Sequence, residues 1–407
     1  MDRIILHSDL NNFYASVECL YDPSIRNKPV AVVGDIEKRH GIVLAKNYLA
    51  KDCGVKTGSA LWEAKELCPD IVFVPPSYDR YISYSKMAKE IYMDYTDQVE
   101  SFGLDECWLD VTQSLNIFGS GRKIADTIRE RIKRELGVTV SIGVSFNKVF
   151  AKLCSDIKKP DATVEVMRDS YRSKIWVLPV EALLYVGRAT RKKLNKLGIY
   201  TIGGLAKADI KILKRELGVN GIMLWRFANG LDLSPVAYIN TLPEIKSVGN
   251  SMTLPYDISN DDDIRITLYT LAESVAERLR KCGCVCGTVQ ISLRDRNLYY
   301  FERQGQLQFE TNSSEEIFKK SMELYRVNRP AEPLRSLGIR CCNLDVIGAR
   351  QLSCLKEFKD MEKRERAERA IDDIRRRFGH FSVQRGIMQT NTALSAVNLN
   401  EDHVMCR

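Results

Sequence analysis

The chain has 407 residues, 44% of them hydrophobic and 28% charged, with a formal net charge of +8 at pH 7. This length predicts two to four domains, and the composition excludes an intrinsically disordered chain. There is no run of eighteen apolar residues, so we expect no membrane partner, and the charged start of the chain does not suit a signal peptide.

The first 165 residues predict strands that alternate with helices. Apolar runs indicate buried strands at 3–8, directly before Asp9, and at 29–34. The helix before Gly137 is indicated by Ile or Leu at every fourth position from 124 to 136. The other expected segments are a helix at 78–96, strands at 99–102 and 107–111 joined tightly at 103–106, a strand at 138–144 and a helix at 147–157. This order predicts a layered α+β domain.

The composition changes after residue 165. Residues 166–235 contain 13 Lys and Arg and 5 Asp and Glu. The difference, 13 − 5 = +8, equals the formal net charge of the whole chain. These residues predict short basic helices separated by glycines, and they suggest a polyanionic partner. A solvated basic surface is the alternative, and charge alone does not decide between the two. The uncharged residues 236–243 indicate a linker or an extended crossing.

The last part of the chain predicts a second α/β unit at 244–348. Its expected segments are strands at 288–293 and 298–302 and helices at 263–281 and 314–326. A charged helix at about 357–378 and a polar tail follow. Because Arg and Glu recur there at helical spacing, we expect this helix to be a solvated surface.

The twelve cysteines are scattered, and none has the C-x-x-C spacing of zinc sites. A metal site at Cys282, Cys284 and Cys286 is the less favoured alternative to buried free thiols. Free thiols indicate a reducing compartment, so we expect a cytoplasmic protein.

Three acidic residues are candidates for a metal site. Asp9 ends a strand, and Asp105 with Glu106 lies in the connection between two others. Convergent carboxylates suit Mg²⁺, and two such ions catalyse in-line phosphoryl transfer. Taken alone, an Asp and a DE pair more often reflect turn or capping chemistry than a metal site.

Four strings occur in order around these acids: DLNNFYASVE (9–18), LAKNYLAKDCGVKTG (44–58), LDECWLDVT (104–112) and GVSFNKVFAKLCSDIKKPD (143–161). Together they resemble the Y-family translesion DNA polymerases, the DinB/UmuC group. Asn11, in place of a second aspartate, is more similar to the UmuC-type branch.

The resemblance implies a right-hand polymerase with a ferredoxin-like palm and a separate α/β little finger. The implied parts are palm at 1–10 and 78–165, fingers at 11–77, a thumb with a helix-hairpin-helix at 166–235, a linker at 236–243, little finger at 244–348 and a tail at 349–407. The implied activity is error-prone translesion synthesis in DNA repair without proofreading, on primer-template DNA and deoxynucleoside triphosphates.

The resemblance also implies roles for individual residues. Asp9, Asp105 and Glu106 match the catalytic carboxylates, and the Leu10 carbonyl completes the binding of two Mg²⁺ ions. Phe13 and Tyr14 match the aromatic pair under the incoming sugar, with Tyr14 excluding a 2′-hydroxyl. The positions implied to hold the triphosphate are Tyr48, Lys51 and Lys159. Lys51 stands where many relatives carry arginine, which weakens bidentate binding.

Residues 186–205 resemble the helix-hairpin-helix, in which a glycine-rich turn and basic side chains bind phosphates. The implied DNA contacts are Gly187, Arg191, Lys192 and Lys193. The second glycine of the usual turn is Ala189 here, so the hairpin is expected to be distorted.

Gln351, Leu352 and Leu355 match the short peptide by which bacterial polymerases bind the sliding clamp. A UmuD-like or recombinase accessory subunit and induction in the SOS response are further expectations from the family. Two other functions use similar acids: a nucleotide cyclase on a related palm, and a catalytically silent DNA-binding paralogue. The cyclase would not need Tyr14 or the hairpin, and the paralogue would be expected to lose an acid.

Overall fold

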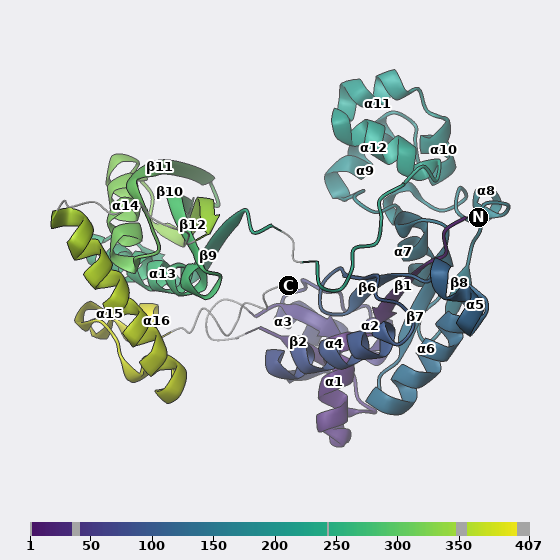
Figure 1. The fold of residues 1–407 in the computed structure, drawn as a ribbon, viewed down its shortest axis with the longest axis horizontal. Helices are drawn as coiled ribbons and strands as arrows, with labels where there is room; N and C mark the ends of the chain where they lie inside the picture. Colours follow the sequence, from purple (N-terminus) through teal and green to yellow (C-terminus); the bar gives the residue numbers. More distant parts are fainter. Residues whose placement is uncertain (1, 35–40, 242–243, 347–355, 397–407) are drawn as a thin grey trace. The chain divides into compact units, whose positions relative to one another are not determined.

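The computed structural model describes residues 2–34, 41–241, 244–346 and 356–396 (Figure 1). They form two compact units, one mainly within Met1–Val33 and Ile42–Leu242 and the other mainly within Pro243–Met405. Across these described ranges, no helix has both the length and the hydropathy to cross a membrane. Both units combine helices with strands, which confirms the predicted α+β class.

A five-stranded sheet in the order β5-β6-β1-β7-β8 lies at the centre of the first unit. Its strands are β1 (Ile5–Leu10), β5 (Val99–Ser101), β6 (Glu106–Asp110), β7 (Val140–Ser145) and β8 (Thr163–Glu165). All neighbours are antiparallel except β7 and β8, which run parallel. Every residue of β1 and β7 is buried, as expected for strands covered on both faces. The short strand β8 was not predicted.

Different helices cover the two faces of this sheet. They are α1 (Phe13–Tyr21), α4 (Tyr78–Met93), α5 (Leu115–Phe118), α6 (Gly121–Leu136) and α7 (Lys148–Ile157). Leu6 and Ile142 share a core with α4 and α6. On the other face, a Cβ atom at Gly143 would lie 2.0 Å from the carbonyl oxygen of Ala151 in α7. Because strand residues alternate between faces, odd-numbered residues of β1 point toward α7.

Local signals set the ends of α6 and α7. The Ser120 side chain accepts a hydrogen bond from the backbone of Lys123, and Gly137 ends α6 in the left-handed region at φ 72°. The Asn147 side chain accepts a hydrogen bond from the backbone N–H of Phe150 at 2.8 Å. Both helices lie where the sequence predicted them.

A small three-stranded sheet in the order β3-β2-β4 occupies the segment after α1. The elements are β2 (Val30–Val33), β3 (Val43–Lys46), β4 (Val72–Val74), α2 (Tyr48–Asp52) and α3 (Leu61–Leu67). The sequence predicted β2 but neither β3 nor β4. Their core is small and contains Ala31, Ala50 and Ala64.

The basic segment forms the expected short helices. They are α8 (Tyr171–Lys174), α9 (Arg188–Lys196), α10 (Ile202–Lys207), α11 (Ile210–Leu217) and α12 (Val219–Ala228). Leu194, Leu205 and Leu224 share a core with Phe150 of α7. The extended residues that follow pass beside β5, where the Ile239 N–H donates to the Asp97 carbonyl at 3.1 Å.

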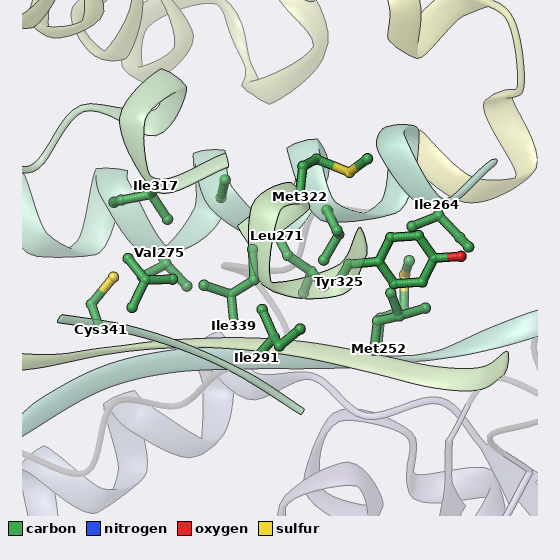
Figure 2. Close-up of a cluster of buried hydrophobic side chains, with 14 of the residues drawn as sticks. Met252, Ile264, Leu271, Val275, Ile291, Ile317, Met322, Tyr325, Ile339 and Cys341 are labelled. Atoms are coloured by element: carbon green, nitrogen blue, oxygen red, sulfur yellow. The ribbon is translucent and has the colours of Figure 1, made fainter. Parts of the chain in front are cut away.

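The second unit is an antiparallel sheet, β11-β10-β12-β9, with helices packed on one face. Its elements are β9 (Ser247–Ile258), β10 (Cys284–Asp295), β11 (Tyr300–Thr311), β12 (Leu334–Val346), α13 (Asp261–Lys281) and α14 (Ser314–Val327). Figure 2 shows the core: Ile291 and Ile339 on the sheet meet Leu271 and Val275 of α13 and Ile317 of α14. The two predicted helices are confirmed, but β10 and β11, at the two predicted strands, have 12 residues each, about twice the predicted length. Leu298, predicted as the start of a strand, lies in a turn at φ 67°.

The expectation that the last charged helix is a solvated surface is wrong for one of its faces, while most of its described side chains are exposed. This helix, α15 (Lys356–Phe378), buries Glu365, Glu368 and Arg375 against the second unit. The Arg280 guanidinium donates to Glu368 at 2.6 Å, and Arg375 donates to Glu273 at 2.8 Å. The short helix α16 (Thr392–Ser395) follows, and Leu394 enters the same core as Figure 2.

Candidate active site

The three predicted acids lie at one edge of the five-stranded sheet. Asp9 in β1 is the register partner of Glu106 in β6, so both side chains leave the same face of adjacent strands. The Leu10 N–H donates to the Asp105 carbonyl at 2.9 Å, which holds the third acid next to the end of β1. Residues far apart in the sequence are therefore neighbours here.

Two lysines contact these carboxylates. Lys159 Nζ lies 2.7 Å from Asp9 Oδ2 and 2.8 Å from Asp156 Oδ1. Lys152 Nζ, from α7, lies 2.5 Å from Glu106 Oε2. The lysine charges offset the repulsion between carboxylates that share a partly buried edge.

His7 is a further member of the site that sequence reasoning missed. Its side chain is fully buried, with Nδ1 2.8 Å from Ser155 Oγ and Nε2 3.5 Å from Glu106 Oε2. Burial lowers the pKa of His7, so the ring is neutral at pH 7. The alternation of β1 could have indicated it, because His7 shares a strand face with Asp9.

The acids differ in their ionisation. Burial raises the pKa of Asp9 to about 7, and the Lys159 charge only partly opposes this shift. Burial and the Glu106 charge raise the pKa of Asp105. Burial also raises the pKa of Glu106, but the interactions with His7 and Lys152 together outweigh this effect and lower the pKa to about 2.

The donor chemistry of this edge fits a divalent cation. Carboxylate and carbonyl oxygens are the ligands that Mg²⁺ prefers, and a cation would relieve the cost of charging the buried Asp9. Within the described ranges, no group of three or more His, Cys, Asp or Glu side chains already has the arrangement of a metal site. The ammonium groups of Lys152 and Lys159 now contact the carboxylates, so a bound cation would replace those contacts. The described cysteines 282, 284 and 286 likewise belong to no such group and are free thiols.

The predicted triphosphate residues lie near the same edge. Tyr48 begins α2, and Lys51 Nζ lies 5.4 Å from the centroid of the Tyr48 ring. Burial raises the pKa of Tyr48, while the charge of Lys159 lowers it and that of Asp9 raises it. Tyr48 therefore lies within electrostatic range of Asp9 and Lys159, and Lys51 lies over its ring.

The aromatic pair at the start of α1 divides between core and surface. Phe13 is buried, with 3% of its surface exposed, and it belongs to the core under the sheet. Tyr14 is half-buried and stacks on Tyr81 of α4, with ring centroids 4.1 Å apart and ring planes 7° apart. The sequence did not identify Tyr81 as a neighbour of Tyr14.

The segment predicted as the helix-hairpin-helix contains α9 and α10, which are joined by residues 197–201. Gly187 directly precedes α9, and a Cβ atom there would meet nothing within 4 Å. The three basic residues predicted to bind DNA, Arg191, Lys192 and Lys193, are exposed. Ala189, the departure from the usual turn, is exposed as well, so its methyl group does not prevent the helix pair from forming. The predicted clamp peptide, with Gln351, Leu352 and Leu355, lies outside the described residues.

Family models match three parts of the chain. Residues 8–156 match the impB/mucB/samB family, 183–232 match the thumb domain of DNA polymerase-iota, and 245–354 match the C-terminal domain of the impB/mucB/samB family. Together these matches cover most of both units.

Curated relatives match over nearly the whole chain. The chain is 52% identical to DNA polymerase IV of Acetivibrio thermocellus, over 98% of this chain and all of that protein. It is 37% identical to DNA polymerase IV 2 of Bacillus subtilis, over 96% of this chain and 95% of that protein. Among solved structures, a Y-family DNA polymerase chimera, Dbh-Dpo4(243-245)-Dbh, is similar at a TM-score of 0.75 and 24% identity. The match covers 84% of this chain and 99% of that structure, and it shows a common fold.

Proposed function

Since this chain belongs to the impB/mucB/samB family and is a Y-family translesion DNA polymerase, we propose that it catalyses two-metal nucleotidyl transfer at Asp9, Asp105 and Glu106. The observation that carries this proposal is the pairing of Asp9 with Glu106 on one strand face, with Asp105 held beside Leu10. The assignment to the UmuC-type branch stays a prediction, since the relatives described above carry only the name DNA polymerase IV.

The acids have distinct roles in this proposal. Asp9 and Asp105 would hold both ions, the Leu10 carbonyl would add a ligand on the nucleotide side, and Glu106 would bind the ion beside the primer 3′-hydroxyl. When bound, two Mg²⁺ ions would activate the hydroxyl nucleophile and stabilise the leaving oxygen. Lys152 and Lys159 offset the charges of Glu106 and Asp9.

The incoming deoxynucleotide is held by the residues near Asp9. Tyr48, Lys51 and Lys159 supply a hydroxyl and two ammonium groups to the triphosphate, which carries several negative charges. Phe13 and Tyr14 lie under the sugar, and the half-buried Tyr14 ring excludes the 2′-hydroxyl of a ribonucleotide by steric contact.

The proposed domains follow the predicted boundaries: palm at 1–10 and 78–165, fingers at 11–77, thumb at 166–235, linker at 236–243, little finger at 244–348 and a tail at 349–407. In the thumb, Gly187, Arg191, Lys192 and Lys193 bind the DNA backbone. In the little finger, a hollow of about 590 Å³ at the sheet is lined mainly by polar residues, with the basic side chains of Arg278, Arg294 and Arg340 and the acidic side chain of Glu302 among them. This polar and basic lining suits DNA phosphates.

We propose that synthesis is error-prone and proceeds without proofreading. The small fingers support the first point, because α2 and α3 have five and seven residues and offer little surface to enclose a base pair. Gln351, Leu352 and Leu355 bind the sliding clamp. A UmuD-like or recombinase subunit and the SOS response remain family expectations, and action on DNA supports a cytoplasmic location.

The metal proposal is tested by primer extension with Asp105→Ala. We expect a loss on the order of 10³-fold, because several kcal/mol of transition-state stabilisation are removed. Asp97→Ala is the matched control, since Asp97 is an exposed aspartate outside this edge. DNA affinity should be roughly equal in the two variants. Undiminished extension by Asp105→Ala would refute the proposal.

A further inference from the structure

The Tyr14 ring is held by a buried tyrosine. Tyr81 in α4 is fully buried and stacks flat on Tyr14, with ring centroids 4.1 Å apart. Tyr78 meets both rings edge-on, at 6.2 Å from Tyr14 and 5.9 Å from Tyr81. One face of Tyr14 is therefore covered by Tyr81, which belongs to the core, and Tyr78 packs against that core.

Tyr81 is fixed in turn by a buried carboxylate. Its hydroxyl donates to Glu18 Oε1 at 2.6 Å, and the Arg80 guanidinium donates to Glu18 Oε2 at 2.9 Å. Glu18 is 6% exposed, so both contacts are needed to offset the cost of burying its charge. Arg80 also lies over the Tyr21 ring, 4.1 Å from its centroid.

These contacts link α1 and α4 through the residue that stacks on Tyr14. Glu18 follows Tyr14 by four residues, so both project from one face of α1. Tyr81 therefore contacts α1 twice, through its ring at Tyr14 and through its hydroxyl at Glu18. Rotation of the Tyr14 ring away from Tyr81 would break the stacking interaction between the two rings.

We propose that Glu18 and Tyr81 are positioning residues that hold the Tyr14 ring rigid and thereby set how strongly the polymerase rejects ribonucleotides. This inference rests on the proposed role of Tyr14. Steric exclusion separates ribonucleotides from deoxynucleotides only if the excluding side chain is rigid. A ring that can rotate away makes room for the 2′-hydroxyl at little energetic cost. Neither Glu18 nor Tyr81 needs to touch the nucleotide.

The ionisation of Tyr81 supports this arrangement. Burial raises the pKa of Tyr81 above its usual range, and the hydrogen bond to Glu18 raises it further. The phenol therefore stays a donor across the working pH range.

The test measures kcat/KM for a deoxynucleotide and for the matching ribonucleotide, and compares their ratio among full-length variants. Tyr81→Phe keeps the stacked ring and removes the hydroxyl, and Glu18→Gln keeps the size and removes the charge. For each we expect the ratio to fall by roughly tenfold, which corresponds to one hydrogen bond to a charged group. Tyr81→Leu, which removes the stack as well, should lower it further, and Tyr14→Ala should lower it most.

Tyr84→Phe is the matched control, because it removes a hydroxyl from α4 at a ring that packs against Tyr21 and not against Tyr14. A loss of folded enzyme lowers both kcat/KM values equally and leaves the ratio unchanged. If Glu18→Gln does not fold, Tyr81→Phe still tests the positioning role.

The outcomes separate the two proposals. If Tyr14→Ala accepts ribonucleotides while the Tyr81 and Glu18 variants keep the wild-type ratio, the positioning role is refuted and the role of Tyr14 stands. If Tyr14→Ala itself keeps the ratio, both proposals fail. An equal fall in Tyr84→Phe would also refute the positioning role.

Discussion

Each paired acid at the proposed active site has its own lysine. Lys159 contacts Asp9, and Lys152 contacts Glu106. The two acids nevertheless differ, because the pKa of Asp9 is raised to about 7 while that of Glu106 is lowered to about 2. Glu106 is thus charged throughout the usual assay range, and Asp9 is the group whose charge changes within it.

We therefore predict that primer extension at limiting Mg²⁺ falls as the pH decreases below about 7. A folded-state pKa above the ordinary value means that Asp9 holds its proton up to that pH, and a protonated carboxyl binds the cation poorly. The rate should fall by roughly tenfold per pH unit, as for one proton. Higher Mg²⁺ should move the midpoint to lower pH, because metal and proton compete.

Lys159→Gln provides a second test of the Asp9 pKa. The charge of Lys159 lowers the pKa of Asp9, so its removal should move the midpoint upward as well as weaken nucleotide binding. A profile at limiting Mg²⁺ that is flat from pH 5.5 to 8 would contradict the assignment to Asp9.

At the scale of elements, α15 is held mainly by buried charges. Glu368 accepts hydrogen bonds from Arg280 at 2.6 Å and from the Ser314 N–H at 2.9 Å, at the first turn of α14. A carboxylate at a helix N-terminus also interacts favourably with the helix dipole. Arg280 donates to both oxygens of Asp372, one turn further along α15.

We predict that Glu368→Ala loosens α15 from the second unit. Removing one partner of a buried ion pair typically costs about 3–5 kcal/mol, because the remaining charge stays buried. Asp373→Ala is the control on the same helix, since the Asp373 side chain is 58% exposed and should change stability little. Hydrogen exchange in 356–378 of the full chain should speed up only in Glu368→Ala. Equal exchange in the two variants would show that α15 does not depend on this contact.

On the scale of the whole molecule, the excess positive charge belongs to the helical thumb segment. We predict that Arg191, Lys192 and Lys193, all changed to Gln, weaken primer-template binding and lower its salt dependence. Each lost phosphate contact reduces the slope of log affinity against log salt by about one, so the slope should fall by up to about three.

Arg122, Lys123 and Arg134, all changed to Gln, provide a control with the same loss of charge on the exposed side of α6. Fluorescence anisotropy over a salt series measures both variants. The same change of slope in both would mean that net charge, rather than the α9 surface, determines the affinity.

The clamp peptide makes a separate prediction for the whole molecule. Leu352→Ala combined with Leu355→Ala should reduce extension in the presence of the sliding clamp and leave extension without the clamp unchanged, because a tether acts by raising local concentration. Cys354→Ala, within the same peptide, is the control. Equal stimulation by the clamp in all forms would reject the peptide as the binding site.

The sequence by itself determined the local features and the family. The helix ended by Gly137 and the helix begun by Asn147 depend on caps and on a four-residue period, which neighbouring residues encode. The four strings around Asp9 and Glu106 carried enough specific residues to identify a Y-family polymerase, as the relatives then showed. The position of the acids at strand ends followed from the same local patterns.

Only the tertiary structure decided which side chains meet. The contacts of Lys159 with Asp9, Tyr81 with Glu18 and Arg280 with Glu368 join residues from 63 to 150 positions apart. The burial of charges in α15 is a further case. Their helical spacing predicts a solvated surface, because the residues that bury them lie on other elements. Strand register and helix packing create these pairs, and the residue spacing within a single segment predicts neither of them.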